Sequence, residues 1–250
     1  MQLTGAVAVV TGAGRGIGAA TTRLLVRRGA TVVALGHRAD EIEAITAETG
    51  ATPLVADVRD PDHARLAMDI AVRRHGRLDA VVANAGIGHY GDVAEMSTER
   101  IDDLVATNVR APMLLARAAL PSMLEQRRGA LVFVTSIAGI LLVPHESVYS
   151  ASKAALEAFA GALRQEVRGN GVTVSTVLPG VVDTGFFDDR GAAYQRERPR
   201  PQPPERVAKA IVRAVERGDD RLVVPPWFRL PIAVRGAAPG LYERLARRFG

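Results

Sequence analysis

The stretch AVAVVTGAGRGIG, residues 6–18, decides how this chain folds. An apolar run, Ala6–Thr11, leads directly into a turn with four glycines, and a helical pattern, Gly16–Arg28, follows. Glycine lets a backbone turn tightly and approach a pyrophosphate closely, while the start of the helix offers free N–H groups and the positive end of its dipole. The stretch therefore predicts a strand–turn–helix unit that holds a dinucleotide. Its predicted cofactor contacts are Gly12, Gly14, Arg15, Gly16, Ile17 and Gly18.

The same alternation of short apolar runs and longer helical patterns continues along the chain. The runs are apolar almost throughout, as expected for strands with helices on both faces. This alternation predicts a single α/β domain with a Rossmann-type, doubly wound sheet of about seven parallel strands. The predicted strands are Ala6–Thr11, Thr31–Leu35, Thr52–Ala56, Ala80–Ala83, Ala130–Thr135, Val172–Leu178 and Leu222–Val224. The predicted helices are Gly16–Arg28, Ala39–Glu48, Pro61–His75, Thr98–Ala119, Ser147–Arg168 and Pro204–Arg217, and residues 186–204 show no clean period.

Composition excludes several classes of protein. The 250 residues are 48% hydrophobic and 24% charged, which is ordinary for a globular domain with a sizeable core. The absence of cysteine excludes disulfides and thiolate metal sites, and the five histidines show no metal-ligand spacing with acids, so no metal is expected. Neither a signal peptide nor an apolar run of roughly 20 residues is present, which predicts a cytoplasmic location.

The C-terminal segment differs from the rest of the chain. We expect a Rossmann-fold catalytic domain over residues 1–225 and a tail over residues 226–250 that carries five arginines, one glutamate and a short amphipathic helix. No nucleic-acid motif accompanies this charge, so nucleic-acid binding is not expected. The apolar stripe Leu241, Leu245 and Phe249 predicts packing, in a homodimer or homotetramer or over the pocket, with contact to an anionic membrane surface as the alternative.

The end of the second predicted strand bears on the choice of cofactor. Sites that prefer NAD carry an acid there, which accepts hydrogen bonds from the ribose hydroxyls, but this chain has Gly36. His37 and Arg38, together with Arg15 of the glycine turn, instead offer groups that can surround a 2′-phosphate, and arginine suits phosphate because its planar fork donates twice. The sequence favours NADP(H), with NAD(H) as the alternative.

A second group of residues points to proton transfer. Tyr149 and Lys153 lie four residues apart on a predicted helix and so share a face, while Ser136 follows the fifth predicted strand and Asn108 lies in the long helix before it. A free phenol has a pKa near 10, and a lysine cation nearby is expected to lower it. The serine hydroxyl can hold a substrate oxygen beside the tyrosine. These four residues are the predicted catalytic set.

Together these motifs resemble the short-chain dehydrogenase/reductase family, in its form of roughly 250 residues. They occur in the family's order, with similar spacing, and the resemblance covers residues 1–225. The matching motifs are Thr11-Gly12-x-x-x-Gly16-x-Gly18, Asp57-Val58, Asn84-Ala85-Gly86, Asn108, Ser136, Tyr149-x-x-x-Lys153 and Pro179-Gly180-x-x-x-Thr184.

The resemblance implies a role for each motif. Asp57 and Val58 would border the adenine, Asn84-Ala85-Gly86 would line the cofactor, and Asn108 would hold a water in a proton relay. Tyr149 would exchange a proton with the substrate, and Lys153 would bind the nicotinamide ribose as well as tune that tyrosine. The implied nicotinamide contacts are Val182 and Thr184, which follow Pro179-Gly180.

The resemblance implies hydride transfer between the nicotinamide and a carbonyl or alcohol carbon. Mostly apolar residues flank the catalytic set, which favours a hydrophobic substrate. Tentative substrate contacts are Ile137, Leu141, His145 and Phe186. Two alternatives fit the residues less well. A non-catalytic, dinucleotide-binding regulatory protein would have no chemical need for the full catalytic set, and a sugar epimerase or dehydratase would need a longer chain with a substrate domain.

Overall fold

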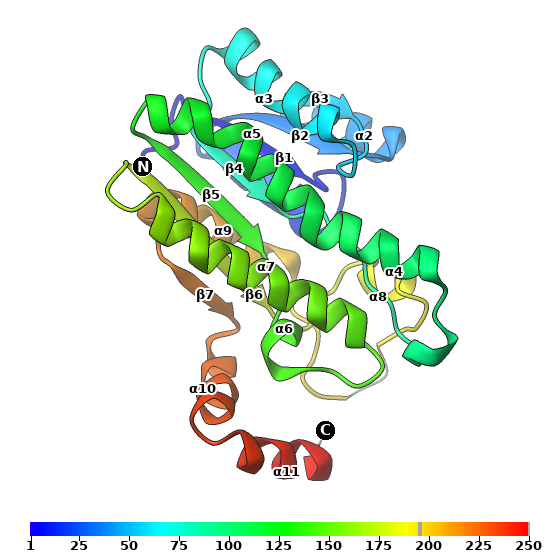
Figure 1. Ribbon diagram of the computed structural model, residues 1–250. Coiled ribbons are helices and arrows are strands. Elements are labelled where there is room, and N and C mark those ends of the chain that lie inside the picture. Colours follow the sequence, from blue (N-terminus) through cyan, green and yellow to red (C-terminus); the bar gives the residue numbers. More distant parts are fainter. Residues whose placement is uncertain (195–196, 250) are drawn as a thin grey trace.

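A seven-stranded, fully parallel sheet forms the centre of the computed structural model, which describes the backbone of residues 1–194 and 197–249 and the side chains of 1–194 and 197–244 (Figure 1). The strand order β3-β2-β1-β4-β5-β6-β7 is that of a doubly wound sheet, so the predicted fold class is confirmed. The strands are β1 (Val7–Thr11), β2 (Thr31–Gly36), β3 (Thr52–Val55), β4 (Ala80–Ala83), β5 (Gly129–Val134), β6 (Val172–Pro179) and β7 (Arg221–Val224).

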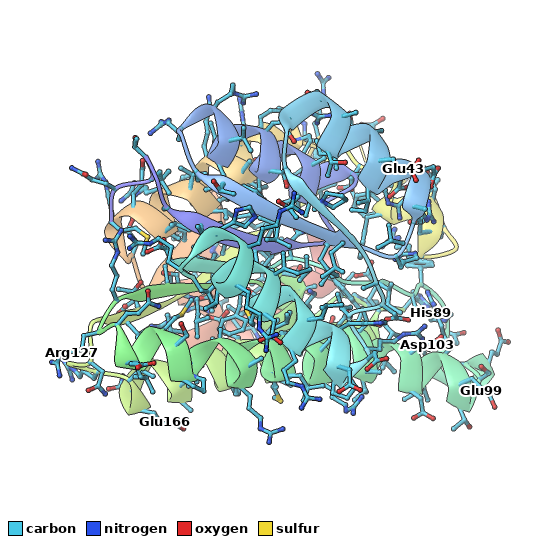
Figure 2. All side chains as sticks on the ribbon, turned by 90° about the horizontal axis from the view of Figure 1, so that it is seen from above. Glu43, His89, Glu99, Asp103, Arg127 and Glu166 are labelled. Carbon is cyan, nitrogen blue, oxygen red and sulfur yellow. The ribbon has the colours of Figure 1, made fainter. Side chains whose placement is uncertain are left out.

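Helices cover both faces of the sheet (Figures 1 and 2). One face packs against α1 (Gly16–Arg27), α2 (Ala39–Thr49) and α9 (Pro204–Arg217). The other packs against α3 (Pro61–His75), α5 (Ala111–Glu125) and α7 (Ser147–Glu166). Figure 2 shows this layering, with Glu43 of α2 and Glu166 of α7 on opposite sides of the sheet.

Strand β1 shows why its sequence is apolar at every position. Successive side chains of a strand point to opposite faces, so Val7 and Val9 enter one core cluster while Ala8 and Val10 enter the other. Each fully buried valine contributes roughly 1.5–3 kcal/mol relative to an exposed one. The five strand residues are all buried, because β1 lies inside the sheet between β2 and β4 rather than at an edge.

The sequence predicts one regular helix over Thr98–Ala119. This prediction is wrong in two respects, because the helix is interrupted and ends later. The structure has α4 (Thr98–Val105), a wide π turn η2 (Ala106–Arg110), and α5, which runs on to Glu125. Pro112 explains the wide turn, because it has no N–H to donate to the carbonyl of Asn108 four residues earlier. The helix continues past Pro121 because its last turn buries Met123 completely.

The tail forms more structure than its sequence predicts. After β7 come the short turn η3 (Pro226–Phe228), α10 (Arg229–Ala237) and α11 (Pro239–Phe249), which extend beyond the end of β7 (Figure 1). Phe228 is buried, and the Tyr242 hydroxyl donates to the carbonyl of Leu141 at 2.7 Å. Leu241 of the predicted stripe is exposed, and the side chains of Leu245 and Phe249 lie outside the described part.

The tail also covers part of a cavity that lies where the strands end, because Tyr242 and Glu243 line this cavity. Packing over the pocket is one of the roles that the sequence predicts for this segment. No helix of the described residues combines the length and apolar character needed to cross a bilayer. Contact of the tail with a partner subunit or a membrane surface stays a prediction.

A buried carboxylate fixes the sheet at the end opposite to the glycine turn. Asp79 immediately precedes β4, its side chain is fully buried, and it accepts the Val7 N–H at 2.9 Å. Arg77 binds both of its oxygens at 2.7 Å, and the Arg128 Nε lies 3.3 Å from it. A buried charge is tolerated when it is paired and hydrogen-bonded in this way.

We predict that Asp79→Ala lowers the free energy of unfolding by about 2 kcal/mol, because the buried Val7 N–H loses its acceptor and the two half-exposed arginines lose their carboxylate. Chemical denaturation monitored by circular dichroism measures this change. Asp69→Ala, which removes an exposed carboxylate 3.9 Å from Arg73, is the matched control and should change stability by less than about 0.5 kcal/mol. Equal losses in the two variants would contradict the anchoring role of Asp79.

Candidate active site

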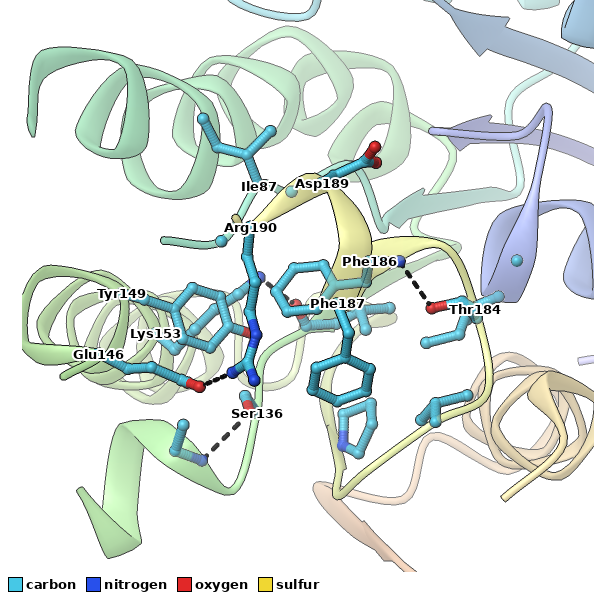
Figure 3. Close-up of a pocket in the computed structure, with 18 of the residues that line it drawn as sticks. Ile87, Ser136, Glu146, Tyr149, Lys153, Thr184, Phe186, Phe187, Asp189 and Arg190 are labelled. Carbon is cyan, nitrogen blue, oxygen red and sulfur yellow. Dashed lines mark hydrogen bonds and ion pairs between the residues drawn. The ribbon is translucent and has the colours of Figure 1, made fainter. Parts of the chain in front are cut away.

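One cavity of about 1110 Å³ lies where the strands end, and it joins the glycine turn to the predicted catalytic residues (Figure 3). In a doubly wound sheet ligands bind at the carboxyl ends of the strands near the switch point, here between β1 and β4. Predicted residues that line it are Gly12, Gly14, Arg15, Gly16, Ile17, His37, Arg38, Asp57, Asn84, Ala85, Gly86, Ser136, Ile137, Leu141, Tyr149, Lys153, Pro179, Gly180, Val182, Thr184 and Phe186. Gly18, Val58, Asn108 and His145 are not among its lining residues.

The glycine turn fits a closely approached pyrophosphate. A Cβ at Gly18 would lie 1.9 Å from the carbonyl oxygen of Gly12, so only glycine lets α1 begin this close to the turn. A Cβ at Gly14 would lie 2.6 Å from Cβ of Glu41, so glycine there lets α2 approach. At Gly86 a Cβ would lie 3.2 Å from the Lys153 Nζ. The absence of side chains keeps the floor of the cavity open to a cofactor.

Polar contacts fix the turn to β4. The Thr11 hydroxyl accepts the backbone N–H groups of Asn84 at 3.1 Å and Ala85 at 3.0 Å. The Asn84 amide donates back to the carbonyl oxygens of Thr11 at 2.9 Å and Gly12 at 3.3 Å. The ends of β1 and β4 are thus held in one rigid unit, and Asn84 acts through hydrogen bonds to the turn.

The cationic side chains predicted to meet a 2′-phosphate are paired with carboxylates. Arg38 donates to Glu41 at 3.0 Å, and the Arg15 Nε lies 3.8 Å from the same carboxylate. Arg15 also forms an ion pair with Asp189, and the Arg38 Nη2 lies 3.8 Å from Asp189. His37 is exposed at the rim. The acid that is missing at Gly36 is therefore present nearby as Glu41, in the first turn of α2, which sequence reasoning missed.

Asp57 and Val58 separate in the structure. Asp57 lines the cavity and binds Arg59 through both oxygens, and this side-chain hydrogen bonding lowers the pKa of Asp57. Val58 packs against the core instead. Asp57 is thereby kept ionised at the place predicted for the adenine.

Tyr149 lies in the first turn of α7 and is buried against Phe186, whose ring centroid is 5.4 Å away. Burial raises the pKa of Tyr149 strongly, since it penalises the phenolate, and the hydrogen bond with Ser136 opposes this only in part. The sequence predicts a lowered pKa for Tyr149, but its net direction is upward, and the groups that lower it are Ser136 and Arg190 rather than Lys153. A phenol that keeps its proton at neutral pH is suited to act as an acid.

Lys153 lies one helical turn beyond Tyr149 and is also buried. Its Nζ donates to the carbonyl of Val134 at 3.1 Å and lies 5.8 Å from the centroid of the Tyr149 ring. Burial lowers the pKa of Lys153 to about 8, because it penalises the ammonium. The ammonium is therefore held by the end of β5, beside the phenol ring.

Asn108 lies in the π turn η2, behind the cavity wall. Its amide accepts the N–H of Ile87 and donates to the carbonyl of Ile87, both at 2.9 Å, and also donates to the Ser152 hydroxyl at 3.1 Å. The side chain is thus used to hold the segment after β4 in place. Pro112 has no N–H to donate to the main-chain carbonyl of Asn108, four residues earlier.

A buried ion pair closes the substrate end of the cavity. Arg190 follows α8 (Phe186–Asp189) and pairs with Glu146, which caps α7 three residues before Tyr149 (Figure 3). Both side chains are less than a tenth exposed. The Arg190 guanidinium also stacks on the rings of Tyr90 at 4.9 Å and Phe187 at 4.6 Å. The pair joins α8 to the catalytic helix.

The predicted substrate residues do not all reach this space. Ile137, Leu141 and Phe186 line the cavity, and Phe186 lies against Tyr149. His145 does not line it: its ring is half exposed, shares a hydrogen bond of 2.7 Å with Asp92, and lies beside Tyr90. No group of histidine, aspartate or glutamate suited to a metal ion occurs among the described residues.

Comparison with known proteins agrees with this geometry. The profile of the short chain dehydrogenase family matches residues 6–195. The chain belongs to the short-chain dehydrogenase family. This family membership confirms the predicted resemblance, and with it that the protein is an oxidoreductase whose cofactor is a nicotinamide dinucleotide.

Several relatives of this short-chain dehydrogenase match most of its length. It is 35% identical to a ketoacyl reductase of Nostoc sp. over 99% of this chain and 90% of the relative. It is 33% identical to an uncharacterized oxidoreductase of Myxococcus xanthus over 97% and 96% of the two chains. Its fold matches that of a 3-ketoacyl-(acyl-carrier-protein) reductase from Brucella melitensis complexed with NADH, with a TM-score of 0.83, 24% identity and coverage of 89% of this chain and 97% of that chain.

Four charged residues of this short-chain dehydrogenase site were missed by sequence reasoning. Glu41 and Glu146 stand at the starts of helices, where an acid is commonly explained by the helix dipole alone. Asp189 and Arg190 lie in the segment whose period is irregular. The signal that was available is the neighbouring pair of opposite charges, Asp189-Arg190, directly after the aromatic pair Phe186-Phe187.

We predict that Lys153→Met raises the free energy of unfolding at pH 7 by about 2–3 kcal/mol, since it removes a buried cation whose pKa is lowered from 10.5 to about 8. Unfolded chains bind the extra proton between these two values, so the wild type gains stability as pH rises through that window. The advantage of the variant should therefore shrink from pH 7 to pH 10. Urea unfolding at several pH values measures it.

Lys209→Met is the matched control, because Lys209 is an exposed lysine on α9. It should change stability by less than about 0.5 kcal/mol at every pH. A Lys153→Met variant that is less stable than the wild type at pH 7, or whose effect is independent of pH, would show that burial of this ammonium is not costly.

Proposed function

We propose that this short-chain dehydrogenase transfers hydride between the nicotinamide of NADP(H) and the carbonyl or alcohol carbon of a hydrophobic substrate, with Tyr149 as the acid and base. The observation that carries this proposal is that Tyr149, Ser136 and Lys153 line the same cavity as the glycine turn. A cofactor on the turn and a substrate beside Tyr149 would share one enclosed space. The bound nicotinamide supplies the hydride or accepts it.

The side chains divide the proton chemistry between them. The Ser136 hydroxyl, hydrogen-bonded to Tyr149, orients the substrate oxygen against the phenol. Tyr149 keeps its proton because it is buried, and gives it to the substrate oxygen as negative charge develops there. Lys153 stabilises the resulting phenolate from the side of β5. Asn108 would hold the water that returns the proton from solvent, with its main-chain carbonyl as the acceptor.

The cavity favours an uncharged, largely apolar substrate. Ile137, Leu141 and Phe186 form apolar walls, while Glu146 and Arg190 neutralise each other. An anionic substrate group would meet the Glu146 carboxylate beside Arg190, and a cationic group would meet the guanidinium. The Nostoc relative is a ketoacyl reductase, which makes ketoacyl compounds the first carbonyl substrates to test.

Two arginines support the choice of NADP(H). Arg15 and Arg38 line the cavity beside the glycine turn, and both can donate to a phosphate. Glu41 supports the alternative, NAD(H), because its carboxylate lines the same part of the cavity and can accept hydrogen bonds from ribose hydroxyls. We favour NADP(H), because a phosphate carries up to about two negative charges and can compete with the single charges of Glu41 and Asp189 for Arg15 and Arg38.

The direct test of function is NADPH absorbance with a panel of ketones, aldehydes and ketoacyl thioesters. We predict that Tyr149→Phe lowers turnover of any active substrate by about 10²–10⁴-fold, because the proton donor is lost. NADPH should still bind, as measured by calorimetry, because the variant keeps the ring. Turnover retained in Tyr149→Phe would remove this residue as the acid.

We predict that Arg15→Met weakens NADPH binding by about tenfold, because a charged hydrogen-bond donor to the 2′-phosphate is lost. NADH binding should change by less than about twofold, since NADH has no phosphate there. Calorimetric dissociation constants for both cofactors measure this difference. Arg27→Met, which replaces an exposed arginine at the end of α1, is the control and should alter neither constant. Equal effects of Arg15→Met on both cofactors would refute the proposed preference.

A further inference from the structure

Asp189 connects the cofactor end of the cavity to the wall that faces Tyr149. Its carboxylate forms an ion pair with Arg15 and lies 3.8 Å from the Arg38 Nη2. These are the arginines proposed to bind a 2′-phosphate, and the role inferred for Asp189 rests on that proposed function. Both arginines and Asp189 are about two-fifths exposed, so solvent and a bound ligand can reach them.

Two neighbouring residues hold α8 from opposite sides. Figure 3 shows the side chains of Asp189 and Arg190 leaving the helix in different directions, with Arg190 directed to Glu146 beside Tyr149 and Asp189 directed away from it. Arg190 makes a buried pair, whereas Asp189 makes an exposed one. The buried pair is costly to break and the exposed pair is not. α8 is therefore held by one ion pair that is costly to break, Arg190 with Glu146, and by one that another anion can replace, Asp189 with Arg15.

Glu41 stands on a more firmly held element than Asp189 does. It lies in the first turn of α2, a helix of eleven residues packed on the sheet through Ile42 and Ile45. Asp189 ends a helix of only four residues, none of them buried. Gly185 lies before this short helix, and a Cβ there would lie 3.1 Å from the Arg15 Nη1, so the segment passes close to the guanidinium.

We infer that Asp189 is a specificity-determining residue of the cofactor site: its carboxylate occupies Arg15 and Arg38 in place of a 2′-phosphate, and NADP(H) must displace it to bind. The phosphate and the carboxylate are both anions that need the same N–H donors. NAD(H) carries no phosphate at this position, so it binds without displacing Asp189. The residue thus lowers the preference for NADP(H) that Arg15 and Arg38 would otherwise give.

The competition has a consequence for the substrate wall. Phe186, the first residue of α8, lies against Tyr149. When Asp189 holds Arg15, α8 is attached at both sides of the cavity, and when a phosphate takes Arg15, only the Arg190 attachment remains. The two cofactors therefore leave the Phe186 wall held by different numbers of ion pairs.

The test is Asp189→Asn, which keeps the shape of the side chain and removes its charge. We expect the dissociation constant of NADPH to fall by about two- to fivefold, the range given by an exposed ion pair, while that of NADH changes by less than about twofold. Calorimetry at one low, fixed ionic strength measures both constants, because exposed charges are screened by salt. An unchanged or weaker affinity for NADPH, or an equal gain for both cofactors, would overturn the inference.

Two further variants separate a specific contact from a general effect of charge. Asp188→Asn removes the same charge one residue earlier, and Asp188 makes no ion pair with Arg15 or Arg38 among the described side chains. It should leave the ratio of the NADPH and NADH constants unchanged, and a gain equal to that of Asp189→Asn would refute a specific competition. In the Arg15→Met background the gain from Asp189→Asn should become smaller, since its main partner is gone.

The same set of variants separates failure of this inference from failure of the proposed cofactor. If Arg15→Met weakens NADPH binding but Asp189→Asn brings no gain, Arg15 binds the phosphate and Asp189 does not compete. If Arg15→Met leaves NADPH binding unaffected, the proposed preference fails, and the inference fails with it. The folded state of each variant is checked by its melting temperature, which should stay near that of the wild type because Asp189 is exposed.

Discussion

The hydrogen bonds between Thr11 and Asn84 are the constraint on which the rest of the site depends. They join the ends of β1 and β4, paired neighbours at the point where the order of the strands reverses. If these two ends moved apart, the glycine turn and the segment before Ile87 would no longer form one floor. Asn108 extends the same unit, since its amide pairs with Ile87 and donates to Ser152 of the catalytic helix. Cofactor floor and proton-transfer residues are therefore held by one continuous set of polar contacts.

Several charged side chains of the site are buried, and burial of a charge costs folding free energy. Lys153 is buried and its pKa is lowered by that burial, and Glu146 and Arg190 form an ion pair with almost no exposure. Well-packed apolar residues at such positions often make a protein more stable, so stability alone does not explain them. In the proposed reaction Tyr149 needs a cation near the phenolate that it forms, and α8 needs an attachment that solvent does not loosen. Around the cavity, this unfavourable burial falls on residues that the proposal assigns to the reaction or to its wall, whereas Asp79 is buried where it fixes the sheet.

The sequence predicted the fold and many of the residues that line the cavity, because both follow local rules. Apolar runs such as Ala6–Thr11 and the glycine turn specify strand, turn and helix by their own chemistry, and the seven predicted strands match those observed to within about two residues. The features that it did not predict depend on distant partners. The break at Asn108 arises from Pro112 and from pairing with Ile87, and the raised pKa of Tyr149 arises from burial, which no spacing reveals. The position of His145 beside Asp92 likewise depends on a contact between segments 53 residues apart.

Selectivity for a cofactor cannot be read from the charge of one loop. The presence of Arg15 and Arg38 predicts a phosphate site, and Gly36 stands where an NAD site carries an acid. In the folded chain, however, the carboxylates of Glu41 and Asp189 lie beside the same two arginines. The preference between NADP(H) and NAD(H) therefore depends on how firmly each carboxylate is held. Glu41 is fixed by a packed helix, whereas Asp189 ends a short helix whose firm attachment is made by its neighbour, Arg190. Because that neighbour holds the helix against Glu146, Asp189 can leave the arginines without releasing the wall beside Tyr149.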